Sequence, residues 1–109
     1  VDKAIKAKDS SALNQMAWTL VDPESDLKER HLDLALRAAV AANRMTEDKD
    51  PAILDTLARA YFWKGDLDKA VVIQMKAIAN AESPMKESLE GALAEYQKAV
   101  DTGKVGSGK

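Results

Sequence analysis

Apolar residues recur along this chain with the spacing that marks one face of an α-helix. The clearest example lies in the middle, where four residues occur at positions i, i+3, i+4 and i+7: Leu54, Leu57, Ala58 and Tyr61. Such spacing aligns the side chains along one side of a helix. No segment alternates apolar and polar residues over the length of a strand, and the β-branched triplet 71–73 lies inside a helical pattern. The pattern therefore predicts an all-α protein.

Proline, glycine and capping residues divide the chain into five predicted helices. Pro23, Pro51 and Pro84 each follow Asp or Ser, the order expected where a capping residue precedes a proline at the first helical position. Gly65 followed by Asp66 predicts the end of one helix and the start of the next. The predicted helices cover residues 10–21, 27–45, 51–64, 66–82 and 84–101.

The apolar spacing of the middle helix occurs twice more. It recurs 41 residues earlier at Leu13, Met16, Ala17 and Leu20, and 35 residues later at Leu89, Ala92, Leu93 and Tyr96. The helices that follow carry small residues at matching places, with Ala35 and Ala42 corresponding to Ala70 and Ala77. Short turns between such helices make them antiparallel neighbours. A period in the mid-thirties indicates stacked helical hairpins, with residues 22–30 as a longer connection in the first one.

Residues 51–84 carry the most complete copy of the repeat, namely Leu54-x2-Leu57-Ala58-x2-Tyr61, then Gly65-Asp66, then Ala70 and Ala77. This segment resembles the tetratricopeptide repeat, a helical hairpin of about 34 residues that serves as a protein-binding scaffold. The departures are Leu54 where the family prefers tryptophan, Ala58 for glycine, Gln74 for an aromatic residue and Glu82 for proline. The resemblance implies architecture rather than a particular activity.

This resemblance implies a right-handed solenoid of helical hairpins. We expect one hairpin over residues 10–45, a second over 51–82 and a capping helix over 84–101. Residues 1–9 are expected to form an N-terminal extension that could end a preceding element, and residues 102–109 a flexible tail. Two hairpins and one helix fall just short of the roughly three units that such arrays usually need.

In a solenoid of this family, the first helix of each hairpin lines the concave side. The family register places six residues there as candidates for binding a peptide or protein partner: Asn14, Trp18, Asp55, Arg59, Phe62 and Trp63. The same register on the last helix gives Glu90, Ala94 and Gln97. Tryptophan and arginine are enriched at binding hot spots. Two plainer interpretations stay open, in which the aromatic residues pack between hairpins and Asp55 forms a surface ion pair with Arg59.

Composition excludes several kinds of chemistry. Sixteen basic and eighteen acidic residues leave a net charge of −2, which gives no positive field for nucleic acid. No apolar run approaches the roughly 20 residues that cross a bilayer, so we expect no membrane partner. Cysteine is absent, which removes thiolate metal sites and cysteine nucleophiles.

Catalytic and metal motifs are also missing from the sequence. The single histidine, His31, lies in a charged stretch where a solvated side chain is expected, and no nucleophile motif or phosphate loop accompanies it. Residues 22–26 imitate the start of a calcium loop, but Leu27 stands where the turn needs glycine and Asp33 replaces the final glutamate. We therefore expect no catalytic residues, no cofactor and no metal.

The sequence thus favours a non-catalytic scaffold that binds a protein or peptide on the concave face of stacked hairpins. An alternative is an accessory or dimerising C-terminal region of a larger protein. Residues 13–18 and 53–58 look similar to repeats attached to thioredoxin-like catalytic domains in exported bacterial proteins. A further alternative is self-assembly into a homo-oligomer or docking against another domain of the parent chain.

Overall fold

The computed structural model describes residues 2–24 and 30–103, and this part of the chain is helical without strands. The predicted all-α class is therefore confirmed for the described residues. The helices are α1 Asp2–Lys6, α2 Ser10–Val21, α3 Leu32–Met45, α4 Pro51–Lys64, α5 Leu67–Ala79 and α6 Met85–Thr102. Most of the predicted flexible tail, residues 104–109, lies outside the described residues.

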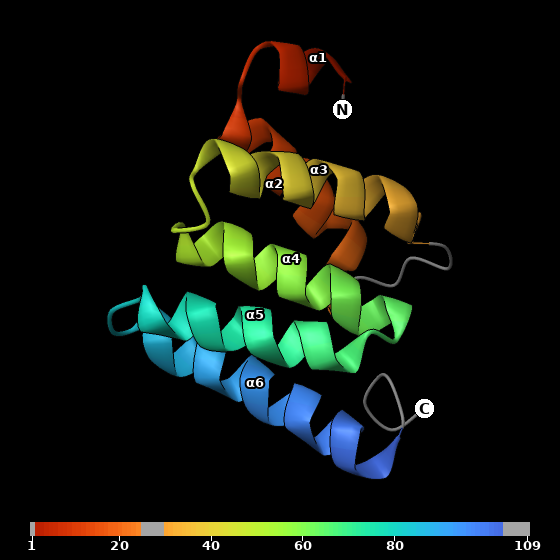
Figure 1. Cartoon of the computed structure of the whole chain (residues 1–109), viewed down its shortest axis with the longest axis vertical. Coiled ribbons are helices and arrows are strands. Elements are labelled where there is room, and N and C mark those ends of the chain that lie inside the picture. Colours follow the sequence, from red (N-terminus) through yellow and green to blue (C-terminus); the bar gives the residue numbers. More distant parts are fainter. Residues whose placement is uncertain (1, 25–29, 104–109) are drawn as a thin grey trace.

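Consecutive helices pack against one another along the longest axis of the molecule (Figure 1). Helix α2 packs on α3, α3 on α4, α4 on α5 and α5 on α6. Helix α2 also contacts α4, so the first helices of the two pairs α2–α3 and α4–α5 are neighbours. The short helix α1 packs on α2 and α3, at the end of the molecule opposite α6 (Figure 1). The molecule measures 41 × 33 × 21 Å.

The bounds of α4 follow from local chemistry that the sequence displays. The Asp50 carboxylate accepts hydrogen bonds from the backbone N–H groups of Ala52 at 2.9 Å and Ile53 at 3.4 Å, which caps the helix ahead of Pro51. Gly65 ends the helix in the left-handed conformation, with φ of 87°. The predicted range 51–64 is confirmed. Helix α2 likewise matches its predicted range, 10–21.

Helix α3 begins later than predicted, because its N-terminal side is held in a loop. His31 has a left-handed φ of 46°, and the helix starts after it at Leu32. The guanidinium of Arg30 donates to the carbonyl oxygens of Leu20 at 3.2 Å and Asp22 at 2.9 Å. Residues 27–29 of the predicted helix lie outside the described residues. Pro23 lies in a turn, within the connection predicted over residues 22–30.

The last two helices differ slightly from their predicted bounds. Helix α5 ends at Ala79, earlier than the predicted residue 82, and the side-chain amide of Asn80 donates to the Lys76 carbonyl at 2.9 Å. Helix α6 runs from residue 85 to residue 102, one residue later at each end than predicted. The Ser83–Pro84 peptide bond between them is cis.

The core consists of leucines set among many alanines. Leu13, Leu54 and Leu89, which hold equivalent places in the three copies of the pattern, are 0, 0 and 4% exposed. Their predicted inward orientation is confirmed. Alanines supply most of the remaining buried positions: Ala17, Ala35, Ala38, Ala39, Ala42, Ala58, Ala60, Ala70, Ala77 and Ala99. Small side chains let neighbouring helices approach closely.

We predict that Leu54→Ala lowers the free energy of unfolding by about 2–5 kcal/mol, because Leu54 is fully buried with Ala77 and Leu89. Urea denaturation followed by circular dichroism measures the change. Val72→Ala serves as the control, since Val72 is 60% exposed and its loss should cost no more than about 0.5 kcal/mol. Equal losses in the two variants would contradict the described core.

Candidate functional site

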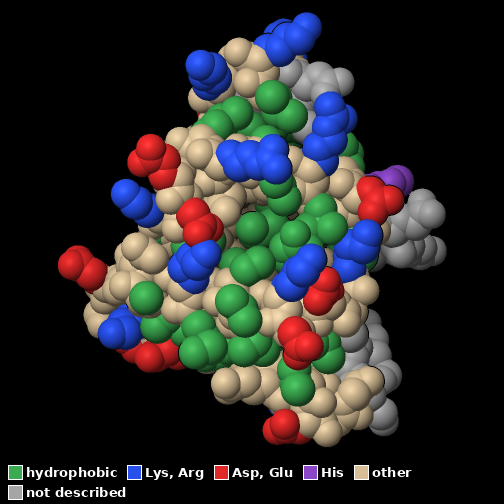
Figure 2. All heavy atoms as spheres, in the orientation of Figure 1, with side chains coloured by type: hydrophobic (Ala, Val, Ile, Leu, Met, Phe, Trp, Pro, Cys, Tyr) green, Lys and Arg blue, Asp and Glu red, His purple; other side chains and the backbone are tan. Residues whose placement is uncertain are grey.

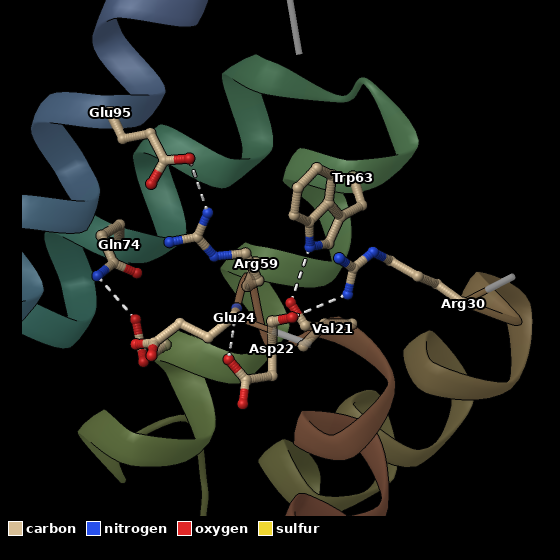
Figure 3. A network of polar contacts seen from close by, with 9 residues as sticks. Val21, Asp22, Glu24, Arg30, Arg59, Trp63, Gln74 and Glu95 are labelled. Carbon is tan, nitrogen blue, oxygen red and sulfur yellow. Dashed lines mark hydrogen bonds and ion pairs between the residues drawn. The ribbon is translucent and has the colours of Figure 1, made fainter. Parts of the chain in front are cut away.

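The candidate site is the side of α2, α4 and α6 that we call the inner surface. It is defined by six side chains: Asn14 and Trp18 from α2, Asp55, Arg59 and Trp63 from α4, and Glu95 from α6. Hydrogen bonds and ion pairs join this surface to the end of α2 and to α5 (Figure 3). A side chain that is already engaged by contacts within the chain is not available to a partner, so the contacts of each residue are described in turn.

Arg59 is committed to an ion pair between α4 and α6. Its guanidinium donates to the Glu95 carboxylate at 3.1 Å, and its side chain is almost fully buried. The same group lies 4.8 Å from the centre of the Tyr96 ring, within the range of a cation–π interaction. The sequence predicted an accessible Arg59, or one paired with Asp55 on the helix surface. Both expectations are wrong, because α6 supplies the partner and covers the guanidinium.

Asp55 is held by a buried glutamine from α5. The side-chain amide of Gln74 donates to the Asp55 carboxylate and to the Leu89 carbonyl, both at 3.0 Å, and thereby joins α4, α5 and α6. Burial raises the pKa of Asp55, while the hydrogen bond from Gln74 and the charge of Arg59 act in the opposite direction. Asp55 as a whole residue is half-buried.

Phe62 belongs to the core and not to the accessible inner surface. It is 0% exposed and stacks on the Tyr96 ring, with 4.7 Å between the ring centres and 27° between the planes. The prediction that Phe62 lines a binding groove is therefore corrected. The helical register placed it toward the concave side, but α6 packs over that position and turns it into an interhelical contact.

Trp63 links α4 to the C-terminal end of α2. Its indole N–H donates to the Val21 carbonyl at 2.8 Å (Figure 3). The Arg30 guanidinium lies 4.3 Å from the centre of the indole ring and also donates a hydrogen bond to the Asp22 carbonyl oxygen. Trp63 is half-buried, and the contacts of both its N–H and its ring are structural. The packing interpretation of this tryptophan therefore agrees with its surroundings.

Of the six predicted binding residues, Asn14 and Trp18 have the side chains that take the smallest part in contacts within the chain. Both side chains are half-buried on one face of α2, four residues apart. Trp18 packs at the margin of a cluster formed by Val21, Ala35 and Ala60. The side-chain oxygen of Asn14 is buried and accepts no hydrogen bond within the described part of the chain. Buried polar atoms are normally satisfied, so this amide is an unusual feature of the inner surface.

Three further buried polar atoms lie in the network around Arg59. The Tyr96 hydroxyl, the Arg59 Nε and the Gln74 Oε1 have no hydrogen-bond partner among the described residues. Burial raises the pKa of the Tyr96 hydroxyl far above its ordinary value, with Arg59 opposing the shift, so the group stays neutral.

Several residues of this surface were not predicted. Glu95, Gln74 and Arg30 carry its polar contacts, yet a single sequence gives no signal for charges or amides that meet across helices. Tyr96 was visible as the last member of the third apolar pattern. The register for the last helix was wrong at Gln97, which lines a shallow hollow with Val71 and Val100 between α5 and α6, away from Arg59.

The described residues contain neither a metal-binding cluster nor a membrane-spanning helix. In residues 2–24 and 30–103, no group of three or more acidic or histidine side chains is placed to hold a metal ion, and no helix is long and apolar enough to cross a membrane. His31 is exposed, as expected. Comparisons with protein-family models, with curated proteins and with solved structures found no match.

We predict that Glu95→Gln lowers the free energy of unfolding by about 2 kcal/mol, because it leaves the buried Arg59 guanidinium without its counter-charge. Thermal and urea denaturation measure the loss. Glu90→Gln on the exposed side of α6 is the matched control and should change stability by less than about 0.5 kcal/mol. An unchanged stability in Glu95→Gln would contradict a structural role for the pair.

The raised pKa of Asp55 predicts a pH dependence of stability. A carboxyl whose folded pKa exceeds 3.8 stabilises the fold fully below pH 3.8, and this contribution is lost as the pH rises through the folded pKa. The free energy of unfolding of the wild type, relative to Asp55→Asn, should therefore be higher below pH 3.8 than at neutral pH. Urea denaturation at both pH values measures the difference.

Asp33→Asn is the control for this experiment. The hydrogen bond and charge of Lys64 lower the pKa of Asp33, so its stabilising contribution is present above pH 3.8 and is lost as the pH falls through the folded pKa. The difference between wild type and Asp33→Asn should thus change in the opposite sense. Parallel changes in the two variants would contradict the burial of Asp55.

Proposed function

We propose that this protein is a non-catalytic scaffold that binds a peptide or protein segment on its inner surface. In this proposal the two helix pairs and α6 form a short solenoid of the tetratricopeptide type. The pairing of α2 with α3 and of α4 with α5, and the contact of α2 with α4, support such an arrangement. A rigid array of this kind presents a partner with a surface that needs little rearrangement.

The observation that carries the proposal is the pair of Asn14 and Trp18 on α2. A carboxamide both donates and accepts hydrogen bonds, which matches the N–H and C=O groups of an extended peptide. The Asn14 oxygen is buried and has no partner among the described residues, so a peptide N–H that reaches it after a rotation of the side chain would satisfy it. The half-buried Trp18 indole adds the apolar, rigid contact typical of binding hot spots.

Asp55 would extend this binding surface from α2 to α4. One oxygen of its carboxylate accepts a hydrogen bond from Gln74, and the residue is half-buried. Arg59, Phe62 and Trp63 hold the helices together in this proposal, so they shape the surface without meeting the partner. The proposed contact set is accordingly narrower than the one predicted from sequence.

We predict that a peptide selected from a library against the full chain shifts the fluorescence of Trp18. The Trp63→Phe variant leaves Trp18 as the only tryptophan and therefore isolates its signal. In that background, Asn14→Ala should weaken the selected peptide about tenfold, the loss expected of one buried hydrogen bond at a hot spot. Fluorescence titration measures both effects.

Thr19→Ala is the control, because Thr19 is exposed and lines a different hollow on α2 with Met16 and Leu34. The affinity of the Thr19→Ala variant for the peptide should stay within about twofold of that of the Trp63→Phe protein without this change. A selected peptide that binds with no change in Trp18 emission, or equally well to Asn14→Ala, would rule out this surface.

A further inference from the structure

A second surface lies between α5 and α6, at the end of the molecule away from α1 (Figure 1). It is a shallow hollow of about 330 Å³ that we call the terminal hollow, lined by Asp68, Val71 and Val72 of α5 and by Gln97, Val100 and Asp101 of α6. The lining residues of each helix are adjacent or three to four positions apart, so they share one face of that helix.

The apolar part of the terminal hollow is unusually open to solvent. Val72 and Val100 are 60% and 43% exposed, and Met75, one turn further along α5, is 54% exposed. Exposed aliphatic residues are ordinary when they occur singly, whereas a group of them around a hollow marks a contact surface. The hollow therefore offers an apolar face that the described part of the chain leaves uncovered.

Both charged residues that line the terminal hollow are acidic. Asp68 and Asp101 are exposed, and neither carboxylate has an ion-pair or hydrogen-bond partner in residues 2–24 and 30–103. Asp101 lies in the last turn of α6, where the carbonyl end of the helix adds partial negative charge. Asp68 lies in the first turn of α5, whose partial positive charge offsets it in part. The hollow thus combines apolar contact with two carboxylates that remain to meet a cation.

The neighbouring lysines leave these carboxylates unmatched. Lys69 follows Asp68 in the chain, but its ammonium lies 3.7 Å from the Asp66 carboxylate and 5.2 Å from the centre of the Tyr61 ring. Lys98 is exposed on α6 and does not line the hollow. Figure 2 shows hydrophobic and acidic side chains over the lower part of the molecule, where α5 and α6 lie, whereas Lys and Arg side chains gather around α1.

We propose that the terminal hollow binds a basic amphipathic helix of a protein partner. The apolar face of that helix would lie on Val71, Val72 and Val100, in the way that hollows between two helices receive the ridge of a third. Lysine or arginine side chains at the edges of the bound helix would face Asp68 and Asp101. The complementary charge would select basic segments and set their orientation.

The charge of the hollow argues against other large ligands. Nucleic acids and anionic membranes attract basic surfaces, and two carboxylates beside the valines repel both. A flat bilayer also requires a protruding apolar face, whereas these valines line a hollow. A helical protein segment satisfies both the shape and the charge.

The basic helix of a second copy, α1, fits the hollow less well. Lys3 and Lys6 give α1 positive charge, but the helix has only five residues. Its Ile5 packs against the core cluster of its own chain and is not available to fill another hollow. We therefore assign the hollow to a partner protein and include self-association as an outcome of the test.

This inference goes beyond the inner surface and does not depend on it. No residue of the inner surface lines the terminal hollow. A ligand of the hollow that contains no tryptophan should leave tryptophan emission unchanged, whereas a ligand of the inner surface alters it. The two proposals can therefore fail separately.

The experiment uses the full chain and three fluorescently labelled peptides of about 15 residues, near the length at which helices persist in water. The basic probe has leucines three and four residues apart with lysine and alanine elsewhere. The second peptide replaces every lysine with glutamate, and the third scrambles the basic sequence. We expect the basic amphipathic probe to bind at least about tenfold more tightly than either of the others in fluorescence anisotropy titrations.

Charge reversal in the chain locates the site. Asp68→Lys combined with Asp101→Lys should weaken the basic probe at least about tenfold and should allow the glutamate peptide to bind. Glu82→Lys combined with Glu90→Lys makes the same change in net charge at exposed positions outside the hollow, and should alter the affinity by less than about twofold. Circular dichroism checks that both variants fold.

Three results would overturn the proposal. Equal affinity for the basic amphipathic and scrambled peptides would show attraction by charge without use of the hollow. Equal weakening by the two double reversals would show a response to net charge alone. A dimer in multi-angle light scattering that Asp68→Lys with Asp101→Lys abolishes would assign the hollow to a second copy of the chain.

Discussion

The close approach of helices whose buried faces are made of alanine is the constraint on which this structure depends. Ala38 and Ala42 on α3, Ala58 on α4 and Ala77 on α5 lie fully or almost fully buried at the contacts between helices. Side chains this small bring the backbones of two helices near each other, where dense packing supplies many weak contacts. A larger residue at any of these places would separate two helices. Shape, more than hydrophobic area, thus determines how the pairs fit together.

Close packing leaves little room for polar groups, so those that are buried act as connections between helices. Gln74 stands where the resembled repeat has an aromatic residue, yet it is fully buried and its amide links Asp55 on α4 with the Leu89 carbonyl on α6. Arg59 and Glu95 make a second link between the same two helices. Such networks are strong when satisfied and costly when broken. They fix α6 against α4, although Arg59 Nε, Gln74 Oε1 and the Tyr96 hydroxyl in this network keep no hydrogen-bond partner among the described residues.

Local signals predicted some elements fully, whereas tertiary contacts decided the rest. Helix α4 was predicted residue by residue, because Asp50 and Gly65 set its ends through their own backbone and side-chain chemistry. The start of α3 was missed, since Arg30 reaches ten residues back to the Leu20 carbonyl and no short-range pattern reveals that contact. Asn14 is half-buried and its side-chain oxygen is covered, so its contact with a partner stays a prediction. The register failed for Phe62, because what covers a helix face depends on a helix more than thirty residues away.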